Sequence, residues 1–106
     1  MPTTSFLVDC EPGLARYRVR FVSEKGKVLE FVVQLECWLR EEWRPVIRFD
    51  TAHGFAHFDA YGPEGQVKAH QPMEVGDYNQ ALTLALTSIR NRWPELILPF
   101  QGEASS

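Results

Sequence analysis

The sequence predicts an α+β domain, with an antiparallel meander sheet of four to five strands followed by one C-terminal amphipathic helix packed on one face. Two observations predict this architecture. Before Pro72, apolar and polar residues alternate along several segments, which is the period of a strand with one buried face. After Pro72, apolar residues recur at helical spacing. Strands first and a helix last favour a helix laid across a curled antiparallel sheet.

The chain has the size and composition of one globular domain. Its 106 residues suffice for a single hydrophobic core, and 44% hydrophobic and 24% charged residues are ordinary values for a folded protein. We place the domain at residues 14–100, after an arm at residues 1–13 and before a flexible tail at residues 101–106. The arm contains the apolar run Phe6-Leu7-Val8, which could add an edge strand.

Two strands are predicted to open the domain, at residues 16–22 and 27–39. In the first, apolar residues alternate with arginines, and in the second, one side is apolar as far as Cys37. The arginine stripe consists of Arg16, Arg18 and Arg20. It could follow an RNA backbone, but we favour a solvated sheet face that is balanced by glutamates of the second strand.

The connection between these strands is predicted to set their register. A three-residue loop, Glu24-Lys25-Gly26, pairs Phe21 with Leu29 and sets Arg20 opposite Glu30, a favourable pair of charges. A loop shorter by one residue sets Phe21 against Glu30. We favour the longer loop, because a slip of one residue moves core side chains into water.

Three shorter strands are predicted next. Residues 40–44 form a turn, and Pro45 opens a third strand where its missing donor does least harm. The third, fourth and fifth strands are placed at residues 46–51, 55–61 and 66–70. The last two are separated by the turn Gly62-Pro63-Glu64-Gly65.

The helix follows these strands. Asp77 is a suitable N-cap, Gln80 stands at the capping-box position, and Pro94 is predicted to end the helix. Residues 96–100 are apolar and are expected to pack back onto the domain. The predicted buried face of the helix consists of Tyr78, Leu82, Ala85, Leu86, Ile89 and Trp93.

Charge, cysteines and hydropathy narrow the class of protein. A net charge of −3 gives no overall attraction to nucleic acid or to an anionic membrane. Cys10 and Cys37 lie far apart, as in a protein with reduced thiols, and Cys37 falls on the predicted core face, which disfavours a nucleophilic role. No signal peptide pattern is found, and no run approaches the roughly 18 apolar residues of a membrane span. We expect a cytoplasmic protein with no membrane partner.

The densest group of reactive side chains lies between residues 48 and 61. If the third and fourth strands pair as a hairpin, these side chains converge on one surface, with the first histidine in the connection. The predicted catalytic residues are His53, His57, Asp50 and Asp59, and the predicted ligand-binding residues are Arg48, Tyr61 and Trp43.

Several interpretations of this group stay open. A histidine beside a carboxylate can act as general acid or base while Arg48 stabilises negative charge, which suffices to cleave a phosphodiester through its own 2′-hydroxyl without a metal. The same groups could only bind a phosphate or carboxylate, or could simply close the loop through hydrogen bonds. His53, His57 and Asp59 suit a divalent metal, but a histidine pair that straddles a glycine is a weak metal pattern. We therefore assign neither a metal site nor a cofactor.

One segment resembles a known family. The run from Trp43 to Gly54, followed by His57 and Asp59, is similar to an uncharacterised bacterial family with the motif R-[YF]-D-T-A-H-G-x-x-H-x-D. Residues 77–83 and Trp93 match the helix of that family as well. The resemblance covers roughly residues 17–96.

More distantly, the segment resembles the TumE-type toxins of bacterial toxin–antitoxin pairs, which carry R-Y-D-N-A-H-G before a histidine-rich segment. This likeness implies a small toxin that is neutralised by an antitoxin and acts on RNA, and it points to Arg48, Asp50, His53 and His57. The chain departs from the toxins at Phe58-Asp59, where they usually have a second histidine.

We therefore carry two hypotheses. The first is a TumE-like toxin that acts on RNA through the His/Asp/Arg cluster. The second is a non-catalytic binding or interaction domain that uses the same polar patch or an exposed sheet edge. An exposed edge strand is also compatible with a homodimer.

Overall fold

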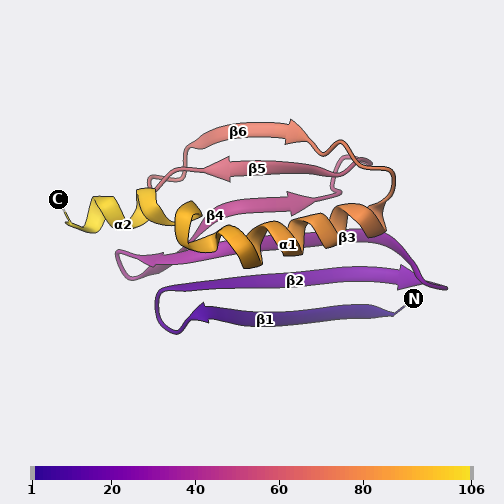
Figure 1. Ribbon diagram of the computed structural model, residues 1–106, viewed down its shortest axis with the longest axis horizontal. Coiled ribbons are helices and arrows are strands. Elements are labelled where there is room, and N and C mark those ends of the chain that lie inside the picture. The colour runs from indigo at the N-terminus through magenta and orange to yellow at the C-terminus, as the bar shows by residue number, and fades with distance from the viewer. Residues whose placement is uncertain (1, 106) are drawn as a thin grey trace.

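The computed structural model describes residues 2–105, and the side chains of residues 2–102. It contains one antiparallel sheet whose six strands lie in chain order, and two C-terminal helices (Figure 1). The α+β class and the antiparallel sheet are confirmed, but the predicted number of strands is wrong. The elements are β1 Thr3–Glu11, β2 Ala15–Glu24, β3 Lys27–Leu39, β4 Glu42–Asp50, β5 His57–Tyr61, β6 Val67–Pro72, α1 Tyr78–Leu96 and α2 Leu98–Ser105.

The sixth strand comes from the segment expected as an arm. Residues Thr3–Glu11 pair along β2 and form one edge of the sheet as β1. Val8 and Cys10 are partly buried against the core, whereas Phe6 and Leu7 remain exposed. Only some of the apolar side chains of β1 are therefore buried when it pairs with β2.

Helix α1 lies across one face of the sheet and packs chiefly on β3 (Figure 1). Between the helix and the sheet lies the core, in which Val33, Leu35, Ala85 and Ile89 are fully buried. No helix among the described residues covers the opposite face of the sheet, which we call the open face. No helix among them is long and apolar enough to cross a membrane.

The β2–β3 hairpin has a different turn from the one predicted. Glu24 pairs with Lys27 around the two residues Lys25 and Gly26, whose φ angles are 51° and 78°. Positive φ at both positions is the geometry of a type I′ turn, which matches the twist of the strands. The prediction of a three-residue loop is therefore wrong.

A bulge restores the pattern that this shorter turn would otherwise break. The register shifts between Val22 and Ser23, so that Phe21 pairs with Phe31, and Leu29, expected in the core, is 40% exposed. One extra residue on β3 returns its apolar side chains to the helix-covered face. Arg20 lies opposite Val32 rather than Glu30, although its guanidinium still reaches Glu30 at 3.4 Å.

Strand β4 begins earlier than predicted and contains Pro45 instead of opening with it. The preceding turn is reduced to Arg40 and Glu41, both with positive φ. Pro45 lies where the register between β3 and β4 shifts, between Leu35 and Glu36. A bulge tolerates proline because the pairing is already interrupted there.

The start of α1 is as predicted, but its end is not. The Asp77 carboxylate accepts a hydrogen bond from the Gln80 amide at 2.8 Å, which confirms the N-cap, and the Gln80 side chain in turn accepts from the Gly76 amide. The helix continues past Pro94 to Leu96. Near the end of a helix, proline removes only one hydrogen bond, and the last turn can tolerate this loss.

The segment after α1 returns to the core, as expected. Ile97 and Phe100 are each 1% exposed. Helix α2 follows the first of these residues and extends through most of the predicted tail, while Ser106 lies outside the described residues.

Candidate functional site: a histidine and aspartate cluster on the open face

Strand pairing brings the predicted cluster together on the open face. Asp59 lies between Arg48 of β4 and His70 of β6, and Asp50 lies beside His57. The residues that alternate with them, such as Phe49, face the core. One row across the open face consists of Leu7, Arg18, Gln34, Arg48, Asp59 and His70.

Asp50 is the most completely bonded group in the cluster. Its carboxylate is buried and accepts hydrogen bonds from Arg48 Nε at 2.8 Å and from the Ala52 amide at 3.1 Å. His57 Nε2 lies 2.9 Å from its Oδ1. Three donors therefore converge on one carboxylate, which ties β4, β5 and the loop between them together.

His57 lies below the surface, with only 2% of its side chain exposed. Its Nδ1 is 3.2 Å from the carbonyl oxygen of Phe55, and its Nε2 faces Asp50. Because both partners are acceptors, a doubly protonated ring satisfies both contacts. This burial and bonding suit a positioning role better than direct contact with a substrate.

His70 forms a second histidine–aspartate pair at the surface. Its Nδ1 is hydrogen-bonded to Asp59 Oδ1, and its side chain is 55% exposed. The other carboxylate oxygen of Asp59 lies 4.0 Å from His57 Nε2. The carboxylate therefore orients an exposed imidazole whose Nε2 is the atom left for a ligand.

Sequence reasoning did not include His70 among the site residues. A simple hairpin around residues 62–65 would place Lys68 opposite Asp59. The turn instead pairs Tyr61 with Val67, and a register shift between Ala60 and Tyr61 adds one more residue, so that His70 lies opposite Asp59. The only signal in the sequence was a histidine on a short predicted strand next to the motif.

His53 joins the cluster from the loop between β4 and β5. A turn closed by the Gly54 amide and the Thr51 carbonyl, at 3.1 Å, presents His53 at the surface. The centre of its ring lies 5.4 Å from that of His57, and the His57 and His70 rings are 5.2 Å apart. Two exposed imidazoles thus contact one buried imidazole.

Tyr61 lies half-buried within the electrostatic influence of this cluster. Burial raises the pKa of its phenol, and the negative charges of Asp59 and Asp50 raise the pKa further, while Arg48 opposes them. The phenol therefore stays neutral near pH 7 and can act as a hydrogen-bond donor.

Trp43, which was predicted to bind the same ligand, belongs to a separate group. The Arg16 guanidinium stacks 4.0 Å from the centre of the Trp43 ring, and Trp38 meets that ring edge-on at 5.4 Å. Glu36 is buried beneath and accepts from Arg16, Arg18 and Gln34 at 2.7–2.9 Å. The carboxylate balances most of the arginine stripe.

Glu36 should make the stability of the protein depend on pH. Burial raises the pKa of its carboxyl, but hydrogen bonds from Arg16, Gln34 and Arg18 outweigh burial, so the pKa lies below its ordinary value. Its stabilising effect is present above the unfolded pKa of about 4.3 and is lost as pH falls through the folded value. In urea titrations from pH 7 to pH 3, we expect Glu36→Gln to flatten the loss of unfolding free energy below about pH 4.3. An unchanged profile would contradict this role.

A divalent metal is the alternative occupant of the cluster. His57, Asp59 and His70 offer ligand atoms that all lie within 4.8 Å of one another, so His70 takes the place that the sequence gave to His53. Two imidazoles and a carboxylate suit zinc or a similar ion. However, His57 Nε2 already contacts Asp50, so a metal ion would have to replace that contact.

Comparisons with known proteins place the chain in a family. No curated protein and no solved structure gives a significant match. A family described as "Domain of unknown function (DUF7718)" matches residues 1–105, which is nearly the whole chain. The protein therefore belongs to the DUF7718 family.

Proposed function

We propose that this protein cleaves RNA by acid–base catalysis that does not require a metal. The observation that carries the proposal is the pair of Asp59 and the exposed His70, with Arg48 directly opposite Asp59 in the strand register. A general base (His70), a carboxylate that orients it (Asp59) and a cation that can bind phosphate (Arg48) then lie side by side on the open face. The distant resemblance of residues 48–57 to TumE-type toxins supports this choice of substrate.

His70 is the proposed general base. A carboxylate at Nδ1 fixes the tautomer and the orientation of the ring, so that Nε2 can accept a proton from a substrate hydroxyl. The side chain is exposed enough for a polynucleotide to reach it. His57 supports the site from below, through Asp50.

Arg48 is the proposed phosphate contact. Asp50 holds its Nε at 2.8 Å and fixes the guanidinium plane, while the side chain is 40% exposed. The terminal nitrogens remain to donate to phosphate oxygens, the geometry that arginine favours for this anion. Tyr61, as a neutral donor nearby, can add a further hydrogen bond to the same group.

The proposed reaction begins when His70 Nε2 takes the proton of a ribose 2′-hydroxyl. The 2′-oxygen attacks the adjacent phosphorus, a new P–O2′ bond forms, and the P–O5′ bond breaks. Protonated His53 gives its proton to the departing 5′-oxygen. The products are a 2′,3′-cyclic phosphate and a 5′-hydroxyl, and the next exchange of protons with water restores both histidines.

An assay of the purified chain tests this proposal. Single-stranded RNA should be cut in the presence of EDTA and leave 2′,3′-cyclic phosphate ends, whereas DNA of the same sequence should stay intact because it has no 2′-hydroxyl. Cleavage that EDTA abolishes and zinc restores would overturn the metal-free mechanism in favour of a metal at His57, Asp59 and His70. RNA that is bound but left uncut would instead favour the non-catalytic binding function.

Growth of a bacterial culture provides a second readout. We propose that such an activity acts as a toxin that a partner antitoxin neutralises. Induction of the chain should arrest growth, and a His53→Ala, His70→Ala variant that accumulates to the same level should not. Normal growth with abundant folded parent protein would contradict the toxin role in that host.

A further inference from the structure

The two edges of the sheet differ in how they resist pairing with another strand. Strand β6 is short and carries Lys68 and Pro72, two features that discourage edge-to-edge contact. Strand β1 has nine residues, TTSFLVDCE, without lysine, arginine or proline. It also exposes Phe6 and Leu7, at 39% and 51%. Such an edge is a template for an added strand.

We propose that β1 pairs antiparallel with β1 of a second copy of this chain, which joins the two sheets into one. This inference does not depend on the proposed function, because the histidine cluster lies on the β4–β6 side of the sheet. Two observations identify the partner as a second copy: the sequence of β1 is complementary to itself in one antiparallel register, and that register brings opposite charges together.

A twofold axis perpendicular to the sheet fixes which residues can meet. Both α1 helices then lie on the same side, so only residues on the same face pair. A pairing centred on Leu7 sets Leu7 against its own copy, Phe6 against Val8, and Ser5 against Asp9. Apolar residues meet apolar residues, and the acid meets a hydroxyl.

The neighbouring registers are worse. A pairing centred on Val8 sets Leu7 against Asp9, and one centred on Phe6 sets Ser5 against Leu7. Each of these places a polar group beside Leu7, and neither lets β1 pair along its whole length from Thr3 to Glu11. The register centred on Leu7 is therefore the self-complementary one.

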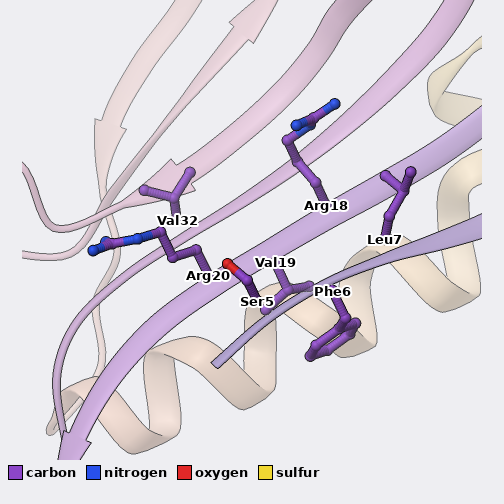
Figure 2. A pocket seen from close by; sticks show the side chains of 7 residues that line it. All are labelled: Ser5, Phe6, Leu7, Arg18, Val19, Arg20 and Val32. Atoms are coloured by element: carbon purple, nitrogen blue, oxygen red, sulfur yellow. The ribbon is translucent and has the colours of Figure 1, made fainter. Parts of the chain in front are cut away.

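The open face adds a charge match across this interface. Ser5 lies opposite Arg20 of β2, so in the proposed register Arg20, Ser5 and Asp9 of the second copy share one row. Figure 2 shows Arg18, Arg20, Ser5 and Leu7 on one side of the strands, and Phe6 directed to the other. The small Ser5 leaves room for the guanidinium to reach over it.

A hollow in the surface marks the same place. It is lined by Ser5, Phe6, Leu7, Arg18, Val19, Arg20 and Val32 (Figure 2). Among the residues whose side chains are described, Arg20 forms an exposed ion pair with Glu30 at 3.4 Å, a type of pair that contributes little. Arg20 is thus available to the carboxylate of the second copy.

Sedimentation equilibrium on the full chain, with matched variants, tests the proposal. The parent should be a dimer, and Leu7→Lys should be a monomer, because two lysines would meet at the twofold axis near Arg18 of both copies. The control Val67→Lys places the same charge on the opposite edge and should remain a dimer. A parent that stays monomeric at high concentration, or a dimer that only Val67→Lys disrupts, would overturn the proposal.

Cross-linking tests the register itself, in a Cys10→Ser background. Leu7→Cys should form a disulfide-linked dimer on mild oxidation, because directly opposed residues in an antiparallel pair have the required Cα separation. Ser5→Cys should not, since it faces Asp9. Efficient linkage through Ser5→Cys and none through Leu7→Cys would overturn this register, because Ser5 would then lie opposite its own copy.

Discussion

Replacing His70 by alanine is expected to slow RNA cleavage by about 10²–10⁴-fold, the usual contribution of one general acid or base. The loss should fall on kcat rather than on KM, because His70 acts on the 2′-hydroxyl proton and Arg48 holds the phosphate. The side chain is 55% exposed, so the variant should keep its fold and its unfolding midpoint. Cleavage rates of a defined RNA at substrate saturation measure the effect.

The matched control is Val67→Ala on the same strand. Val67 is 60% exposed and makes no part of the proposed site, so both kcat and stability should match the parent. Asp59→Asn tests the positioning role, because an amide can bond Nδ1 yet can also hold the ring in the wrong tautomer. This variant should lower kcat and keep RNA affinity. A His70→Ala variant that cleaves at the parental rate would remove His70 from the mechanism.

The main elements of the fold could be predicted because they rest on local periodicity. The boundaries of β3 are the predicted ones, and the Asp77 N-cap follows from one side chain and its neighbour. The errors occurred where a single extra residue decides the outcome. With the bulge near Val22, a two-residue turn sets apolar residues of β2 opposite apolar residues of β3, which was predicted to need a three-residue loop. With the bulge at Pro45, β4 begins before the proline instead of after it. The extra residue near Val22 offsets the shorter turn, so the apolar residues of β2 and β3 still pair and the periodicity gives no sign of the bulge.

The cluster was predicted in part for the same reason. Arg48, Asp50, His57 and Asp59 belong to two consecutive strands, so alternation alone puts them on one face. His70 required the register of β5 and β6, which a bulge sets. The burial of His57 could not be predicted either, because it depends on tertiary contacts: the Phe55 carbonyl at Nδ1 and the neighbouring rings of His53 and His70. Trp43 was predicted to be part of the site because it lies near the motif in the sequence, but its ring stacks against Arg16 of β2, away from the cluster.

Asp50→Ala is expected to destabilise the protein by about 3–5 kcal/mol, the usual cost of removing one partner from a buried ion pair. The His57 side chain is only 2% exposed, and its Nε2 would lose its acceptor. The Ala52 amide and Arg48 Nε would lose the same acceptor. Urea unfolding at pH 7 gives the change in free energy. Glu30→Ala, which breaks an exposed pair with Arg20, is the control and should change stability by about 0–1 kcal/mol.

A double-mutant cycle separates the buried pair from simple loss of packing. If the cost of Asp50→Ala is mainly a stranded imidazolium, replacing His57 by phenylalanine in the same chain should recover part of the lost free energy, since an apolar ring needs no acceptor. The two substitutions should then be strongly non-additive. Additive losses would mean that Asp50 stabilises the fold through Arg48 and the Ala52 amide alone.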